Sequence, residues 1–127
     1  MQISEAARRA GLSPSAIRYY ERIGLLPPAA RRGSDRDYGP DDLKRLAVLK
    51  FARETGFTIA QIKTFFGDFS GSASDRWQRA ATRKIAELRA VLDETATRLR
   101  RLESMTRCRC EAFEECGARL SETACAR

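Results

Sequence analysis

The sequence contains no histidine and no long run of apolar residues. Histidine is the commonest general base and the commonest nitrogen ligand of metal ions, so the chain lacks the side chain that most often fills either role. No stretch reaches the roughly 18 apolar residues that a membrane span needs. Neither a nucleophile–base pair nor a glycine-rich phosphate-binding loop is visible. We therefore predict that the chain is not an enzyme and does not cross a membrane.

A secretion signal is also missing, since Met1 to Glu5 have neither its basic start nor its apolar core. This predicts a cytoplasmic protein, in which thiols stay reduced. Cysteine is scarce, with four residues in the chain. In a reducing compartment, four cysteines are typical of ligands or reactive thiols rather than of disulfides.

Acidic residues are outnumbered, because 24 Lys and Arg face 17 Asp and Glu for a net charge of +7. Such a balance favours a polyanionic partner, nucleic acid before membrane. Residues 1–63 hold 12 basic and 7 acidic side chains, whereas residues 64–127 hold 12 and 10. The N-terminal half is therefore the better candidate for phosphate contact, and a merely soluble basic surface is the alternative.

Two short helices are predicted at the start of the chain, over 3–10 and from 14 to about 23. Ser4 is a plausible N-cap for the first helix. The pair Ser13 and Pro14 suits the start of the second, because Ser caps and Pro fits the first helical position. Two short helices separated by a Gly-containing turn predict a helix-turn-helix.

The next segment, 26–39, contains a Pro-Pro pair and an Arg-rich turn, and it predicts a small β-hairpin, or wing. A helix should follow from Pro40, with acids in its first turn and Gly56 after its end. Thr58 is the expected cap of a further helix over 59–66.

A polar link over 67–73 separates these elements from a long predicted helix over 74–105. At 1.5 Å per residue that helix spans about 48 Å. Its apolar seam has alternating spacings of three and four residues: Ile85, Leu88, Leu92, Thr95, Leu99 and Leu102. This heptad pattern predicts pairing with a second copy in a two-helix dimer. The alternative is a helix that folds back on its own domain.

Candidate DNA contacts lie on the second helix and the wing. Arg18 can reach a base edge or a phosphate, and tyrosine hydroxyls suit phosphate oxygens. The candidates are basic or aromatic: Arg18, Tyr19, Tyr20, Arg31, Arg32, Arg36 and Tyr38. For Tyr38, bracing of the wing is the more plausible role. The alternatives are a solvated Arg and a half-buried Tyr.

Cys108, Cys110 and Cys116 form a C-x-C-x5-C cluster directly after the long helix. Three thiols this close in sequence can hold one soft metal ion or help to hold an iron–sulfur cluster. Three Arg residues flank them and favour the thiolate that binds metal: Arg107, Arg109 and Arg119. Three nearby acids oppose this: Glu111, Glu114 and Glu115. Cysteines packed in a small core are the alternative.

The motifs of residues 1–66 resemble the MerR family of effector-responsive transcription regulators. The matching segments are Ile3–Ala7, Gly11–Leu25, Arg36-x-Tyr38, Leu43-x-x-Leu46 and Gly56–Ile62. The resemblance implies a mainly α homodimer, with a winged helix-turn-helix domain over 1–69 and an antiparallel coiled coil over 74–105. It implies an effector-binding Cys loop and tail over 106–127.

Members of that family bind promoters whose −35 and −10 elements are too far apart. Effector binding distorts the DNA, so that RNA polymerase can use the promoter. Carried over by position, the resemblance places DNA contacts on Ser15, Arg18, Tyr19, Tyr20, Arg36 and Lys63. The wing departs from the common pattern, because Ser34 and Asp35 precede Arg36.

Cys108 and Cys116, with seven residues between them, are similar to the pair in copper-efflux sensors of this family. In divalent sensors a further Cys stands where this chain has Ser74. The resemblance therefore implies two thiolates on a monovalent ion such as Cu(I), Ag(I) or Au(I). Cys110 adds a third thiolate, which Hg(II) or Pb(II) would accept, and thiolates also serve Zn(II) and Cd(II).

The redox-sensing branch of the family, which holds a 2Fe-2S cluster, is the main alternative. That cluster needs four cysteines. The branch has its further Cys where this chain has Met105, so Cys125 would have to fold back to replace it. Thiol oxidation, a cysteine-dependent redox enzyme and a structural zinc domain are the remaining alternatives.

Overall fold

The protein is mainly helical, as the sequence predicts. The computed structural model describes residues 1–27, 30–32, 35–67 and 71–121. Its elements are, in order, α1 Ile3–Ala10, α2 Pro14–Arg22, β1 Ala30–Arg32, β2 Asp35–Asp37, α3 Pro40–Glu54, α4 Ile59–Gly67, α5 Ala73–Met105 and α6 Phe113–Leu120. They form two compact units, Met1–Ala81 and Thr82–Arg127. None of the helices described is long and apolar enough to cross a membrane.

Helix α1 has the predicted bounds, but the prediction that Ser4 caps it is wrong. The chain becomes helical one residue after Gln2, whose carbonyl oxygen accepts the first helical hydrogen bond from Ala6 N at 3.0 Å. Ser4 therefore lies inside the first turn. Gly11 ends the helix in the left-handed region, at φ 68°, where a Cβ is disfavoured.

Helix α2 confirms the predicted cap. The Ser13 hydroxyl accepts a hydrogen bond from Ala16 N at 3.1 Å, and Pro14 occupies the first helical position. The helix ends at Arg22, one residue earlier than predicted. It packs against α1, which completes the predicted helix-turn-helix.

The predicted wing is present as a two-stranded antiparallel sheet. Strands β1 and β2 pair in the register Ala30↔Asp37, Arg31↔Arg36 and Arg32↔Asp35. The turn is predicted over residues 31–35, but Arg31, Arg32 and Asp35 belong to the strands. Gly33 and Ser34 lie outside the described residues.

The predicted starts of α3 and α4 are confirmed by local hydrogen bonds. Gly39 N donates to the Asp42 carboxylate at 2.9 Å, just before Pro40. Thr58 and Gln61 form a reciprocal cap, with Gln61 N donating to the Thr58 hydroxyl and Thr58 N donating to the Gln61 side chain. At both starts, a side chain accepts a hydrogen bond from a backbone N–H group that would otherwise lack a partner.

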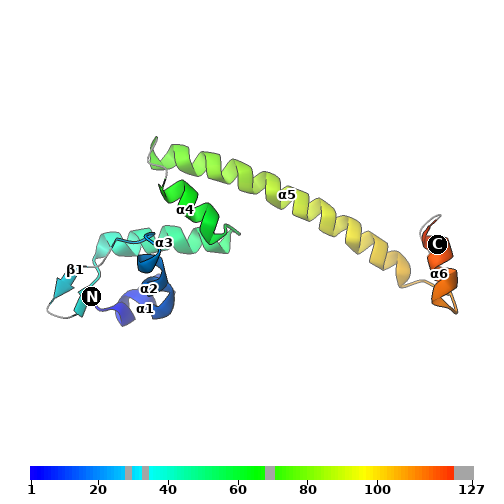
Figure 1. Ribbon diagram of the computed structural model, residues 1–127, viewed down its shortest axis with the longest axis horizontal. Helices are drawn as coiled ribbons and strands as arrows, with labels where there is room; N and C mark the ends of the chain where they lie inside the picture. The colour runs from blue at the N-terminus through cyan, green and yellow to red at the C-terminus, as the bar shows by residue number, and fades with distance from the viewer. Residues whose placement is uncertain (28–29, 33–34, 68–70, 122–127) are drawn as a thin grey trace. The chain divides into compact units, whose positions relative to one another are not determined.

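The core of the first unit surrounds α3. Helices α1 and α2 lie on one side of α3 and α4 lies on the other (Figure 1). The buried side chains are Ala6, Ala7, Ile17, Tyr20, Leu25, Leu26, Tyr38, Leu46, Leu49, Ala52, Phe57 and Ile62. They come from every element of the unit except the hairpin and α5, so the core fixes α2 against its neighbours.

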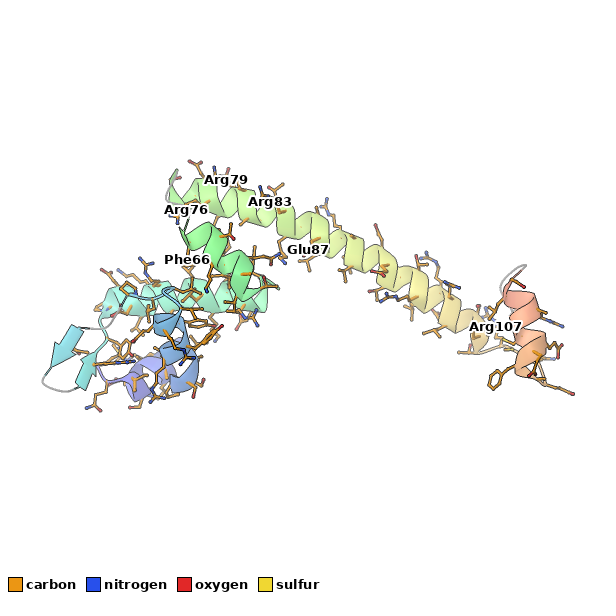
Figure 2. The ribbon with its side chains drawn as sticks, viewed as in Figure 1. Phe66, Arg76, Arg79, Arg83, Glu87 and Arg107 are labelled. Carbon is orange, nitrogen blue, oxygen red and sulfur yellow. The ribbon has the colours of Figure 1, made fainter. Side chains whose placement is uncertain are left out.

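The first turns of α5 are attached to α4. The Arg76 guanidinium donates to the carbonyl oxygens of Phe65 at 2.9 Å and Phe66 at 2.6 Å. Figure 2 labels Arg76 in the first turns of α5 and Phe66 on the neighbouring α4. A cation at these last carbonyls complements the negative end of α4. Trp77 adds a ring contact with Phe65 at 4.9 Å between centroids, beside an apolar pocket of about 480 Å³ that Val48 also lines.

Helix α5 begins at Ala73, one residue earlier than predicted, and ends at Met105 as predicted. Ser72 and Asp75 cap it reciprocally, since Asp75 N donates to the Ser72 hydroxyl at 3.1 Å. The seam side chains are exposed in the single chain, up to 67% for Leu92 and Leu102.

Helix α6 is an element that the sequence does not predict. It follows Ala112 and carries Glu114 and Glu115 in its first turn, where acids complement the positive end of a helix. Cys116 is its one buried residue among those described.

Candidate metal centre and nucleic-acid interface

The three thiols of the second unit come together. The Sγ atoms of Cys108, Cys110 and Cys116 all lie within 4.8 Å of one another. Cys116 is buried and the other two are half-buried, and none forms a disulfide. The cluster therefore combines one buried residue with two partly exposed ones.

Local structure places the first two thiols at the end of α5. The helix continues beyond Met105 as tight turns, with Arg107 N donating to Ser104 O and Cys108 N donating to Met105 O at 3.1 Å. Arg107, which is labelled in Figure 2, lies at this end of α5 and close to α6. Cys108 is thus held immediately after the helix, two residues before Cys110.

The third thiol is placed by α6. Cys116 lies one turn into that helix, and its N–H donates to Ala112 O at 3.2 Å. Helix formation turns Cys116 inward while Phe113 stays 91% exposed. Only residues 111 and 112 separate Cys110 from α6, so the chain turns back sharply. Helix α6 thereby brings the Cys116 thiol close to the other two.

The spacing of the three sulfurs fits a soft ion. Sulfurs about 2.3 Å from a central ion lie about 4 Å apart in a trigonal arrangement and about 4.6 Å apart in a linear one. The sulfurs of Cys108, Cys110 and Cys116 already lie within 4.8 Å of one another. Small side-chain movements would therefore complete either geometry, and the donor set is all sulfur, which soft ions prefer.

The charges around the thiols differ from the sequence expectation at Arg119. Its guanidinium pairs with the Glu115 carboxylate at 3.3 Å on the exposed side of α6. Arg107 and Arg109 are exposed. The basic side chains nearest in sequence thus lie toward solvent, and the favourable field expected from Arg119 is largely cancelled by its partner.

Three further positions were considered in the sequence as possible sites of a ligand: Ser74, Met105 and Cys125. Ser74 is exposed in the first turn of α5 and accepts a hydrogen bond from Gln78 Nε2 at 3.3 Å. Met105 is the half-buried last residue of that helix. Cys125, weighed as a fourth cluster ligand, lies outside the described residues.

In the first unit, Ser15, Arg18 and Tyr19 are exposed on one face of α2, because residues three and four apart are neighbours on a helix. The Arg22 guanidinium lies over the Tyr19 ring at 5.3 Å. Lys63 is exposed on α4. These side chains are accessible to a nucleic acid.

Tyr20 and Tyr38 are placed differently, since they are 6% and 1% exposed. Their rings belong to the core, so their part in DNA binding would be to position other groups. The Tyr38 hydroxyl donates to the Glu21 carboxylate. Burial, and secondly this hydrogen bond, raise the pKa of Tyr38 above its usual value.

Arg36, the middle residue of β2, is bonded within the protein. Its Nη1 lies 2.8 Å from Glu21 Oε2. The hydrogen bond with Tyr38, followed by the charge of Glu21, raises the pKa of Arg36 above its usual value. Arg31 pairs with Arg36 across the hairpin through the backbone.

Glu21 is thus a candidate functional residue that the sequence pattern does not predict. It is an acid in an otherwise basic stretch, three residues after Arg18 and next to Arg22. That contrast of charge is the one signal in the sequence that points to it.

Comparison with known proteins decides the family. Residues 1–67 match the family described as MerR HTH family regulatory protein, and residues 43–105 match the family described as MerR, DNA binding. The chain belongs to the MerR family. It is therefore a DNA-binding transcriptional regulator, as the motifs predict, and its relatives are regulators rather than enzymes.

Relatives in this family extend over most of the chain. The HTH-type transcriptional regulator HmrR of Sinorhizobium medicae is 41% identical over 105 residues, which cover 76% of this chain and 71% of that one. Heavy metal-dependent transcription regulator 2 of Rhizobium meliloti is 39% identical over 109 residues, covering 80% and 74%. The crystal structure of a Ralstonia metallidurans transcription regulator in complex with lead(II) is 27% identical, covers 95% and 98%, and superposes with a TM-score of 0.70.

Proposed function

We propose that this MerR-family regulator senses a soft metal ion through Cys108, Cys110 and Cys116 and activates a resistance or efflux promoter. The observation that carries the proposal is the convergence of three sulfurs within 4.8 Å in a DNA-binding regulator. The names of its relatives support it, since one is heavy metal-dependent and another was solved with lead(II).

The expected ligands are ions that prefer thiolates to oxygen or nitrogen. The group comprises Cu(I), Ag(I) and Au(I), with Hg(II) and Pb(II) as ions that accept a third sulfur, and Zn(II) as a harder competitor. The position of Cys110 within reach of the other two sulfurs supports three-thiolate binding. Closure of the thiolates on one ion would tie α6 to the end of α5.

The proposed DNA contacts lie on α2, the wing and α4. Arg18 and Tyr19 face outward from α2 with Ser15, and Lys63 faces outward from α4. Arg31 and Arg36 belong to the wing. Tyr20 and Tyr38 would support these contacts from the core. Residues 1–69 form the DNA-binding part in this proposal.

The exposed seam of α5 supports a homodimer. A helix of this length with leucines exposed along one line gains stability when a second copy covers them. Residues 74–105 would then be the dimerisation helix and residues 106–127 the effector-binding part. Metal binding at the end of the seam would change how two DNA-binding parts are held, and so distort the promoter for RNA polymerase.

Absorption spectroscopy tests the metal site directly. Reduced protein titrated separately with Cu(I), Ag(I), Hg(II) and Zn(II) should show sulfur-to-metal charge-transfer bands or competition for a chromogenic chelator, with one ion per chain. Cys108→Ser and Cys116→Ser should each lower the affinity for the preferred ion at least about 100-fold, because one of few thiolates is lost. Cys110→Ser should lower the affinity for Hg(II) more than the affinity for Ag(I), because two sulfurs suffice to bind Ag(I).

The matched control is Cys125→Ser, which removes a thiol that is not among the three proposed ligands and should leave the titration unchanged. If the purified protein is brown and bleaches on reduction, the effector is the 2Fe-2S cluster and not a single metal ion. Loss of folding in Cys108→Ser without added metal would instead indicate a structural zinc domain.

A further inference from the structure

One carboxylate joins the recognition helix α2 to the wing. Glu21 lies in the last turn of α2, and its side chain is 8% exposed. One of its oxygens accepts a hydrogen bond from the Tyr38 hydroxyl, and the other pairs with Arg36 Nη1 at 2.8 Å. Arg36 and Tyr38 thus share one carboxylate. We call these three side chains, joined through Glu21, the wing latch.

The wing needs such an anchor because it is small. Each strand has three residues, and an isolated two-stranded hairpin is at best marginally stable. Tyr38 secures the end of β2 from the core, and its N–H donates to Met1 O at 2.8 Å. Glu21 is the member of the wing latch that belongs to α2, so it sets how the wing is held relative to that helix.

The charge of Glu21 is unusual for its place. Arg18 and Arg22 on the same helix are exposed, and an exposed acid beside them would repel phosphates. Burial and the pairing with Arg36 keep this negative charge away from the surface. The same pairing reduces the attraction of Arg36 for DNA. Glu21 therefore lowers the general charge attraction of the wing while it fixes the wing's position.

We propose that Glu21 is a positioning residue for DNA selectivity, which holds the wing and α2 in the one arrangement that fits a specific site. This inference rests on the proposed DNA contacts of α2 and the wing. Phosphate contacts made in the correct register add to specific binding, whereas a loosened wing with an unpaired arginine binds any duplex. Glu21 would thus lower the affinity for any duplex and raise the preference for a specific site.

The informative variant is Glu21→Gln, which keeps the size of the side chain and an acceptor for the Tyr38 hydroxyl but removes the charge. Arg36 then loses its ionic partner. We expect binding to a scrambled duplex to tighten severalfold, with a salt slope steeper by about one unit, as one more phosphate contact would give. We expect the ratio of specific to non-specific affinity to fall at least about tenfold.

The probes are two duplexes of equal length: the sequence that the wild-type protein enriches most from a randomised library, and a scrambled version. The matched control is Glu54→Gln on α3, because Glu54 is 63% exposed and its pairing with Lys50, at 3.8 Å, is loose. It changes the net charge equally. A selectivity ratio for Glu21→Gln equal to that of Glu54→Gln would overturn the proposal.

A second measurement needs no DNA. Amide hydrogen exchange in β1 and β2 should accelerate in Glu21→Gln at least about tenfold, while α1 and α3 keep their wild-type protection. Unchanged exchange in the hairpin would overturn the wing latch, and so would equal acceleration throughout the first unit, which indicates a merely structural role. Failure of the wild-type protein to enrich any sequence would instead contradict the proposed DNA contacts, and hydrogen exchange would still decide the latch.

Discussion

At the residue scale, the protein places two groups of side chains where their chemistry depends on close neighbours. The thiols of Cys108, Cys110 and Cys116 lie within 4.8 Å of one another because α6 returns one of them to the other two, and their proposed function depends on this closeness. Glu21 and Tyr38 act as a pair inside the first unit. In both cases the proposed role of one side chain depends on its neighbours.

Tyr38→Phe tests the second group through stability. The variant should lower the free energy of unfolding by roughly 1–3 kcal/mol near pH 8, because it leaves one buried oxygen of Glu21 without its donor. The pKa of Tyr38 is raised in the folded protein, so its contribution is fully present below the ordinary tyrosine value near 10 and is lost as pH rises through the folded value. Denaturant unfolding of both proteins between pH 8 and 11 measures this.

The difference between wild type and Tyr38→Phe should therefore shrink at the alkaline end of that range. A difference that stays constant up to pH 11, or that grows, would contradict the raised pKa and the hydrogen bond to Glu21.

Residues whose partners are close in sequence could be predicted, and the others could not. Ser13 and Thr58 cap their helices as expected, because each bonds an N–H three residues ahead. Glu21 and Tyr38 are 17 residues apart, and their contact depends on how the hairpin meets α2. No local pattern encodes that meeting, so the contrast of charge around Glu21 does not identify its partners.

At the element scale, long and periodic segments were predictable, whereas α6 was not. Helix α5 repeats its apolar spacing over many turns, which specifies its bounds to within one residue. Helix α6 has eight residues, and Ala112 before it provides no side-chain cap. Its position beside the thiols is therefore a result of tertiary structure, and it turns a predicted loop into a shaped site.

Charge on the α5 seam should break the proposed dimer. Glutamate at both Leu92 and Leu99 places like charges on the line that two helices would share, so the variant should be monomeric at micromolar concentration. Sedimentation equilibrium would measure this. Ala90→Glu, on an exposed position of α5 outside the seam, is the control and should remain dimeric.

A monomeric wild-type chain at these concentrations would contradict the homodimer. A seam variant that keeps its dimeric mass would show that α5 dimerises, if at all, through another face. Circular dichroism should show that both variants remain helical, because the changed positions are exposed in the single chain.

At the scale of the whole molecule, the family and the general fold could be predicted because motifs from the first residues to Ile62 agree with one another. The chain carries a basic DNA-binding unit and a thiol-bearing unit, and one long helix belongs to both. A regulator with this organisation can respond to an ion without direct contact between the ion and DNA. The cysteine pattern narrows the preferred ion to the soft, thiolate-binding class, and it does not single out one species.

The most direct test of the account is in vitro transcription by purified RNA polymerase from a promoter that the reduced protein occupies, with each soft ion added in turn. We predict that one ion per chain of the preferred species increases transcript at least about tenfold while promoter occupancy stays nearly constant, and that Cys116→Ser still occupies the promoter but no longer responds. Transcript that is unchanged by every soft ion, or that rises equally in Cys116→Ser, would contradict the claim that the thiol cluster is the metal-responsive switch.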